Sequence, residues 1–479
     1  MKKLIIFDLD GTLNKIENYA VPSMLSSLKD LGIEGFTEED VKKTFGAKDE
    51  DTEAFFFGSR AKELTPVFWK KVNEYVEGPL RDSYATYEGT EKMLQWLKNE
   101  GYITAVCSNS SMAYITKTVE RLGIREYIDE LQETVPGAKK QDSLKMLLDR
   151  VSPDEALMVG DRYFDKVAAD MNHIAFAACL YGYGDEKEFE GADVYLNTPM
   201  DLILYLWKKD KKPCRLLALD LDGTLTNSQK EITPHTKDVL MKMQESGVRI
   251  ILASGRPVYG IMPIAKQLKL NQYGGYILAF NGGRIIDCKT GDILFSKDLP
   301  ADVPAKLMAQ ARKYNTAIVT YENADLITEM PNDVYVNKEA FINKMNVKCV
   351  ADFASYVDFP VNKCILMAEG DYLAEVEPKV KAAFGDELSI YRSEPFFLEV
   401  MAKNIDKAES LGKLLEILNL DREVLVACGD GHNDCSMIQF AGLGVCMSNG
   451  QPPVKEAADY IAPSNDEDGV AYVVEHIVL

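Results

Sequence analysis

The chain has 479 residues, of which 46% are hydrophobic and 27% are charged. This composition is typical of folded globular proteins and excludes disordered and collagen-like classes, and the length suits two or three domains. The formal net charge of −21 repels phosphate backbones and anionic lipid, so we expect neither a nucleic acid nor a membrane as a partner.

Short apolar runs alternate with amphipathic stretches along the whole chain. Runs that predict strands in the first half lie at 4–7, 103–107, 157–159 and 174–177. Those in the second half lie at 215–219, 248–253, 275–279, 424–428 and 443–446. Predicted helices between them lie at 91–99, 112–122, 237–246 and 407–418. Continuous apolar runs suit strands covered on both faces, so the pattern predicts an α/β fold with a parallel, doubly wound sheet in each half.

The sequence contains one long internal repeat. Leu4–Leu13 (LIIFDLDGTL) returns as Leu216–Leu225 (LLALDLDGTL). Gly160–Asp165 (GDRYFD) returns as Gly429–Asp434 (GDGHND). A repeat of this length is far longer than solenoid periods and indicates two tandem domains.

Acidic and hydroxyl side chains follow the predicted strands, where doubly wound sheets bind their ligands. They are Asp8, Ser108 and Asp161 in the first half, and Asp220, Ser254 and Asp430 in the second. Crowded aspartates repel one another, and a hard cation with oxygen ligands, Mg²⁺ above all, relieves that repulsion. A Gly-Thr turn, a serine and a lysine at a helix start supply donors for a phosphate. Each half is therefore predicted to hold a site for phosphoryl transfer.

In this order, the motifs resemble those of the haloacid dehalogenase superfamily of phosphatases, twice and over essentially the whole chain. The resemblance implies two tandem Rossmann-like domains, each with an inserted cap. It implies a Mg²⁺-dependent phosphoric monoester hydrolase that acts on small sugar or metabolite phosphates through an aspartyl-phosphate.

The resemblance also implies a role for each motif residue. Asp8 and Asp220 match the nucleophile, and Asp10 and Asp222 match the acid/base that protonates the leaving oxygen and later activates water. Metal ligands and their support would be Asp8, Asp10, Asp161, Asp165, Asp220, Asp222, Asp430 and Asp434, with Asn433 beside them. Phosphate and substrate contacts would be Thr12, Ser108, Asn109, Lys140, Thr224, Ser254, Gly255, Arg256, Asn281, Lys407 and Asn433. Lys139 and Lys403 are the local alternatives to Lys140 and Lys407.

The position of the extra sequence distinguishes the two halves. In the first domain, at 1–208, an insertion at about 14–87 resembles the helical cap of the phosphoglycolate-phosphatase-like branch. In the second, at 214–479, an insertion at about 299–388 resembles the α+β cap of the Cof-like branch. A charged linker at 209–213 joins them. Two different caps predict two different substrates, or two steps of one pathway.

Two alternatives stay open. The first half resembles phosphomutases with helical caps, whose chemistry is the same up to the aspartyl-phosphate. Alternatively, one half is a non-catalytic regulatory or binding module, although both halves keep the motif residues.

The cysteine and histidine positions argue against a zinc site or a Cys-x-x-Cys redox site. The nine Cys form no Cys-x-x-Cys pair, and no two of the four His have the spacing of a metal pair. The apolar run before Asp8 is too short for a signal peptide, and no apolar stretch is long enough to cross a membrane. We therefore expect a cytoplasmic protein with free thiols whose partners are small phosphorylated metabolites.

Overall fold

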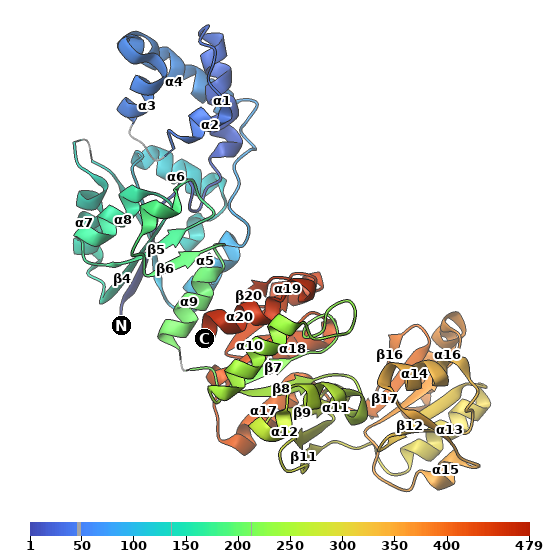
Figure 1. Ribbon diagram of the computed structural model, residues 1–479. Coiled ribbons are helices and arrows are strands. Elements are labelled where there is room, and N and C mark those ends of the chain that lie inside the picture. The colour runs from blue at the N-terminus through green and yellow to red at the C-terminus, as the bar shows by residue number, and fades with distance from the viewer. Residues whose placement is uncertain (46–48, 136, 212) are drawn as a thin grey trace. The chain divides into compact units, whose positions relative to one another are not determined.

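The computed structural model describes residues 1–45, 49–135, 137–211 and 213–479. The chain forms two compact units, Met1–Leu206 (unit 1) and Trp207–Leu479 (unit 2) (Figure 1). Within each unit, a smaller cap is inserted into an α/β sheet domain. The predicted linker at 209–213 starts inside a helix, because α9 runs over Asp201–Asp210, and residue 212 of that prediction lies outside the described residues.

Unit 1 contains a six-stranded sheet in the order β3-β2-β1-β4-β5-β6. Its strands are β1 (Lys3–Phe7), β2 (Ile103–Ser108), β3 (Glu130–Glu133), β4 (Glu155–Gly160), β5 (Ala175–Cys179) and β6 (Val194–Leu196). The helices of this domain are α5 (Thr90–Asn99), α6 (Met112–Arg121), α7 (Lys140–Val151), α8 (Tyr163–Met171) and α9. All strand pairs are parallel, which confirms the predicted doubly wound sheet.

Strand register brings the motif residues of unit 1 to one edge of the sheet. Phe7 at the end of β1 lies opposite Val159 of β4, and β2 pairs with β1 on the other side. Because the strands are parallel, Asp8, Ser108 and Asp161 all lie at their carboxyl ends.

The cap of unit 1 is helical, as predicted. It consists of α1 (Glu17–Asp30), α2 (Glu38–Lys42), α3 (Asp49–Phe57) and α4 (Ala61–Glu77). An apolar cluster that includes Met24, Phe56, Phe68 and Val72 fills the space between these helices.

Unit 2 contains an eight-stranded sheet in the order β11-β10-β9-β8-β7-β18-β19-β20. Its strands are β7 (Leu216–Leu219), β8 (Arg249–Ala253), β9 (Tyr276–Ala279), β10 (Arg284–Asp287), β11 (Ile293–Ser296), β18 (Leu425–Gly429), β19 (Leu443–Met447) and β20 (Tyr460–Ala462). Its helices are α10 (Pro234–Glu245), α11 (Val258–Gln267), α12 (Leu270–Tyr273), α17 (Lys407–Leu418), α18 (Cys435–Phe440), α19 (Pro452–Ala457) and α20 (Gly469–Ile477). The neighbouring strands β9, β8, β7, β18, β19 and β20 are parallel. At the β9 side, β10 and β11 add an antiparallel edge.

The cap of unit 2 has a sheet of its own, in the order β14-β13-β12-β15-β17-β16. The strands are β12 (Ala317–Glu322), β13 (Asp325–Thr328), β14 (Asn346–Cys349), β15 (Lys363–Met367), β16 (Leu388–Glu394) and β17 (Phe397–Ala402). Its helices are α13 (Val303–Lys313), α14 (Val334–Asn343), α15 (Phe353–Tyr356) and α16 (Gly370–Phe384). The α+β class is as predicted, but the predicted end at 388 is too early, because the β16–β17 hairpin continues the cap sheet to Ala402.

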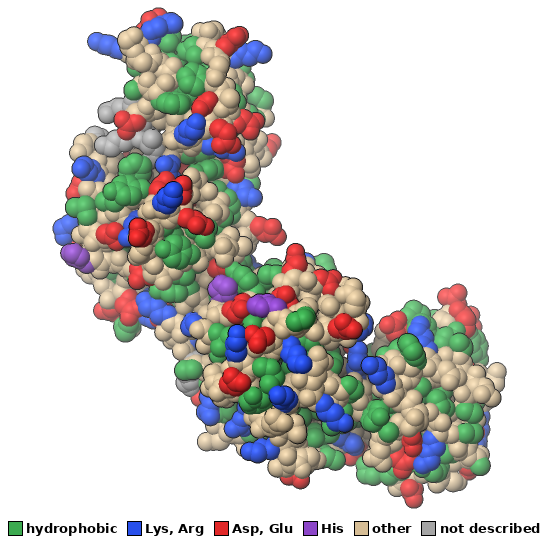
Figure 2. All heavy atoms as spheres, viewed as in Figure 1, with side chains coloured by type: hydrophobic (Ala, Val, Ile, Leu, Met, Phe, Trp, Pro, Cys, Tyr) green, Lys and Arg blue, Asp and Glu red, His purple; other side chains and the backbone are tan. Residues whose placement is uncertain are grey.

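Charged side chains are spread over the surface. Figure 2 shows acidic and basic side chains interspersed on the visible face rather than gathered into one basic patch. Within the described ranges, no helix is long and apolar enough to cross a bilayer.

Candidate active sites

Three aspartates converge at the carboxyl end of the unit 1 sheet. Asp8 follows β1, Asp161 follows β4, and Asp165 lies in the first turn of α8. All three are buried, and one carboxylate oxygen from each lies within 4.8 Å of the others. The structure therefore brings together the acidic side chains that the sequence places far apart.

A buried lysine partly neutralises this cluster. Lys140, the first residue of α7, forms ion pairs with Asp8 and Asp165. Burial opposes the charge of this ammonium group, but the two carboxylates outweigh burial and raise the pKa of Lys140. Lys139 is exposed, so the structure places Lys140, not its neighbour, beside Asp8.

The remaining negative charge is suited to a cation. Burial, and then the charges of Asp8 and Asp165, raise the pKa of Asp161 well above its ordinary value. Burial also raises the pKa of Asp165 to about 6. A divalent ion bound to these side chains would favour the charged form of both carboxylates. The donors present here are all carboxylate oxygens, which suit such an ion.

Asp10 lies two residues from Asp8 and is held by neutral donors. Its Oδ1 accepts hydrogen bonds from Asn14 Nδ2 at 2.6 Å and from the Tyr114 hydroxyl at 3.0 Å. Burial is the main reason that the pKa of Asp10 rises to about 7. The sequence missed both donors. Asn14 directly follows the repeated motif, but nothing in the sequence indicates that Tyr114 on α6 reaches this carboxylate.

Three polar side chains of unit 1 that were predicted to contact phosphate make hydrogen bonds within the protein. Ser108 lies at the end of β2, and its Oγ accepts the backbone N–H of Ser110 at 3.2 Å, which orients it toward the site. Asn109 follows it, and its side chain accepts from Thr134 at 3.2 Å. Thr12, for which a phosphate contact stays a prediction, donates its hydroxyl to Asp161 at 3.2 Å.

Unit 2 repeats this arrangement. Asp220, Asp430 and Asp434 have carboxylate oxygens within 4.8 Å of one another. Lys407 Nζ lies 2.7 Å from Asp220, 2.5 Å from Asp434 and 3.0 Å from the carbonyl oxygen of Ala253. Burial, and then the charge of Asp434, raise the pKa of Asp220 to about 7. The internal repeat of the sequence is therefore a repeat of the site.

The threonine and the serine of unit 2 follow the same pattern. Thr224 donates its hydroxyl to Asp430 at 2.8 Å, as Thr12 does to Asp161, and its predicted phosphate contact stays a prediction. Ser254 Oγ accepts the backbone N–H of Arg256 at 3.2 Å.

The two sites differ at the second aspartate. Arg256 donates to both oxygens of Asp222, from Nε at 2.8 Å and from Nη2 at 2.6 Å, and Lys230 lies 2.9 Å from Oδ1. Burial would raise the pKa of Asp222, but Arg256 and Lys230 outweigh it and lower that pKa. Arg256, predicted to face the substrate, thus also fixes the orientation of the Asp222 carboxylate.

A chain of hydrogen bonds joins the unit 2 site to its cap. Asn433 donates to Asn281 at 3.1 Å, and Asn281 donates to the Tyr391 hydroxyl at 3.1 Å. From the cap sheet, Lys363 lies 3.0 Å from Glu399 and donates to the carbonyl oxygen of Gly255 at 3.2 Å. The sequence analysis missed the three cap residues that make these contacts, Lys363, Tyr391 and Glu399. The one available signal was Lys363, a lone charge at the head of the apolar run KCILM.

The turn after Asp10 leaves no room for a side chain. Gly11 has a φ of 90°, and a Cβ at this position would overlap the carboxylate of Asp161. We expect Gly11→Ala to displace Asp161 and to lower about 100-fold the phosphoryl-transfer activity that the motifs predict for unit 1, measured as phosphate release by an Asp220→Asn chain. Gly32→Ala is the matched control, because φ is 70° there and nothing lies within 4 Å. Its expected cost is about 1 kcal/mol of stability with turnover retained, and equal losses in both variants would contradict the steric argument.

Comparisons with known proteins identify relatives of both halves. A sequence profile described as haloacid dehalogenase-like hydrolase matches residues 217–474, and a second with the same description matches residues 5–179. The 5-amino-6-(5-phospho-D-ribitylamino)uracil phosphatase YcsE of Bacillus subtilis is 30% identical over 266 residues, which are 55% of this chain and 96% of that protein.

Solved structures show the same coverage. A crystal structure of a haloacid dehalogenase-like hydrolase from Bacteroides thetaiotaomicron is 47% identical, with a TM-score of 0.54, and the match covers 55% of this chain and 99% of the other. The Thermotoga maritima protein TM0651 is 26% identical, with a TM-score of 0.51, over 56% of this chain and 98% of its own. Each of these relatives therefore accounts for about half of the chain.

Proposed function

The chain belongs to the haloacid dehalogenase-like hydrolases, and we propose that each of its units is a Mg²⁺-dependent phosphatase that hydrolyses small metabolite phosphates through an aspartyl-phosphate. The observation that supports this most is the duplicated site. In each unit, a buried aspartate is ion-paired with a buried lysine and lies beside two further aspartates. The YcsE relative is a phosphatase of a phosphorylated metabolite, which supports phosphorylated metabolites as the substrate class.

We assign the attack on phosphorus to the first aspartate of each repeated motif. One oxygen of Asp8 and one oxygen of Asp220 are each held by the site lysine, which leaves the other oxygen for attack. The lysine also reduces the repulsion between the carboxylate and an anionic phosphoryl group. In this step the bond from the aspartyl oxygen to phosphorus forms, and the bond from phosphorus to the leaving oxygen breaks.

We assign the proton transfers, to the leaving oxygen and from water, to the second aspartate of each motif. Because burial raises the pKa of Asp10 to about 7, a fraction of this group carries a proton near neutral pH and can give it to the leaving oxygen. The resulting carboxylate then takes a proton from water as the water oxygen bonds to phosphorus and the aspartyl bond breaks. In unit 2, Arg256 and Lys230 lower the pKa of Asp222, so its carboxylate form dominates at neutral pH and suits the second transfer, in which it takes a proton from water.

The acidic clusters fit a divalent cation. Asp8, Asp161 and Asp165 would hold it in unit 1, and Asp220, Asp430 and Asp434 in unit 2. When bound, Mg²⁺ supplies positive charge to the phosphoryl oxygens as charge develops on them. We expect dialysis against EDTA to abolish phosphate release and added Mg²⁺ to restore it.

Product analysis tests the proposed reaction. With a sugar phosphate as substrate, hydrolysis yields free phosphate and free sugar in equal amounts. The phosphomutase alternative for unit 1 yields an isomerised sugar phosphate and little free phosphate. An isomerised sugar phosphate formed by an Asp220→Asn chain would therefore overturn the proposal for unit 1.

The bidentate contact between Arg256 and Asp222 gives a further prediction. Arg256→Lys keeps the charge but cannot donate to both carboxylate oxygens, so we expect kcat of unit 2 to fall about tenfold or more. The assay uses an Asp8→Asn chain, in which only unit 2 turns over. Arg312→Lys, at an exposed ion pair in the cap of the same unit, is the control and should keep the parent rate. Equal rates for both variants would show that the contact does not orient Asp222.

A further inference from the structure

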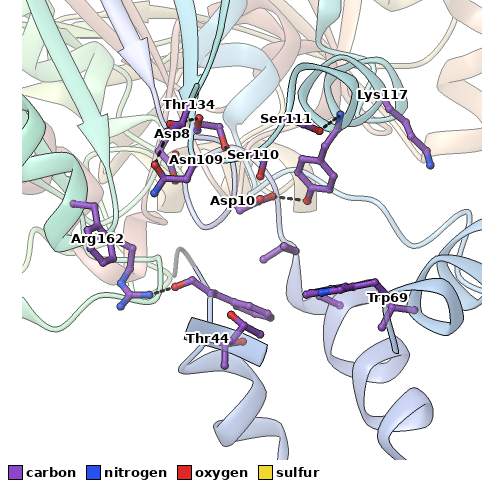
Figure 3. A pocket seen from close by; sticks show the side chains of 18 of the residues that line it. Asp8, Asp10, Thr44, Trp69, Asn109, Ser110, Ser111, Lys117, Thr134 and Arg162 are labelled. Carbon is purple, nitrogen blue, oxygen red and sulfur yellow. Dashed lines mark hydrogen bonds between the residues drawn. The ribbon is translucent and has the colours of Figure 1, made fainter. Parts of the chain in front are cut away.

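A cavity of about 750 Å³ lies between the aspartate cluster of unit 1 and its helical cap. Asp8, Ser108 and Lys140 line the end where we place the phosphoryl group. Figure 3 shows Thr44 and Trp69 on the cap side of this cavity, across from Asp10 and Ser110. A phosphoryl group with a two- or three-carbon alcohol would fill a small part of a cavity of this size, because pockets of about 300–1,000 Å³ hold ligands as large as drugs.

The cap wall of this cavity is mainly apolar. Its larger contributors are Met24, Phe45, Trp69, Val72, Val76 and Tyr84. Among the described cap residues that line the cavity, none carries a formal charge. Two cations of the sheet domain, Lys117 and Arg162, also line the cavity. Both are already paired, Lys117 with Glu77 and Arg162 with Glu188, and the described part of the cap wall adds no further cation for a second anionic group on the leaving alcohol.

Several polar groups of this wall already have protein partners. The hydroxyl of Ser23 donates to the carbonyl oxygen of Ala20 at 3.1 Å, and that of Thr44 donates to Val41 at 2.7 Å. The indole N–H of Trp69 donates to Glu53 at 3.1 Å. Thr52 and Asn73 add two further polar side chains. Since the hydroxyls of Ser23 and Thr44 and the indole N–H of Trp69 are engaged, the part of a ligand that lies against the cap wall meets chiefly hydrocarbon and aromatic surface.

We propose that unit 1 acts on phosphate monoesters whose leaving alcohol carries a flat apolar ring, which lies against Trp69, Val72 and Met24. This inference rests on the proposed function of the same site. Binding the ring in the cavity removes apolar surface of both ring and wall from water, and Trp69 is an aromatic partner for it. A polyhydroxylated alcohol would instead lose hydrogen bonds to water that this wall does not replace.

A matched pair of inhibitors tests the inference on the full-length chain. Asp220→Asn silences unit 2, so that turnover of acetyl phosphate reports unit 1. Two non-hydrolysable compounds, 2-phenylethylphosphonate and ethylphosphonate, differ only in the ring and are compared as competitive inhibitors. We expect the phenyl compound to bind at least about tenfold more tightly.

Two variants locate the ring, and a third serves as control. Trp69→Ala should reduce the affinity ratio to about threefold or less, and Val72→Thr, which keeps the volume of the side chain, should reduce it in the same direction. Phe55→Ala removes an aromatic ring from the exposed side of the cap and should leave the ratio unchanged. Thermal melts confirm that each variant is folded.

The outcomes separate the inference from the function on which it rests. A ratio near one, or a ratio that neither Trp69→Ala nor Val72→Thr lowers, overturns the inference while unit 1 stays a phosphatase. A chain without any Asp8-dependent turnover of acetyl phosphate overturns the proposed function of unit 1, and the inference falls with it.

Discussion

Asp8→Asn should lower turnover by unit 1 at least about 1,000-fold while unit 2 keeps its full rate, and Asp220→Asn should do the reverse. An amide nitrogen and a neutral carbonyl oxygen cannot replace the attacking carboxylate, whereas the rest of each site stays in place. The measurement is release of phosphate from acetyl phosphate by the parent chain, the two single variants and the double variant. The two single-variant rates should sum to the parent rate, and the double variant should be inactive.

Surface aspartates provide the matched controls for this experiment. Asp30 forms an exposed ion pair with Lys71 in the cap of unit 1, and Asp302 pairs with Lys306 in unit 2. Replacing either by asparagine should leave both rates unchanged. If Asp8→Asn leaves every measured rate unchanged, unit 1 is a binding or regulatory module and the proposal of two active sites is wrong.

Lys407→Met should destabilise unit 2 by about 3 kcal/mol or more when no divalent cation is present. The Lys407 side chain is fully buried between Asp220 and Asp434, so its removal leaves two carboxylates desolvated without their counter-ion. Burial already raises the pKa of Asp220 to about 7, which shows how unfavourable the charged form is there. The measurement is urea unfolding of the full chain in EDTA, followed through the transition of unit 2.

The control lies on the same helix. Lys413 on α17 forms an exposed pair with Glu416, and Lys413→Met should leave the transition unchanged because water screens that pair. Added Mg²⁺ should restore part of the stability that Lys407→Met loses, since a cation that binds only the folded state stabilises it. Identical transitions for both variants would show that Lys407 does not neutralise the acidic cluster.

The sequence predicted the centre of each fold well. Strands that are buried on both faces, such as β1 and β7, are continuous apolar runs, and their motifs repeat. It missed the edge strands. β3 has the sequence ELQE, and β6 and β20 have three residues each, so hydrogen bonding to a neighbouring strand, and not a pattern of their own, makes them strands.

The positions of the motif residues were more predictable than the contacts around them. Motif residues follow strands directly, and strand register alone brings Asp8 and Asp161 together. Contacts that depend on the cap or on side-chain packing have no corresponding motif in the sequence. The Tyr114 hydroxyl on Asp10 and the Lys363–Glu399 pair join segments far apart in the chain, and no local pattern reports them.

If an aspartate in each unit accepts the phosphoryl group, that group can be trapped on the protein during turnover. The full chain is acid-quenched during turnover of acetyl phosphate with Mg²⁺, digested, and analysed by peptide mass spectrometry. We predict a phosphoryl group on the peptide that contains Asp8 and on the peptide that contains Asp220, each lost in its own Asn variant. Phosphate release at the full rate, with neither peptide ever labelled, would show that neither Asp8 nor Asp220 accepts the phosphoryl group.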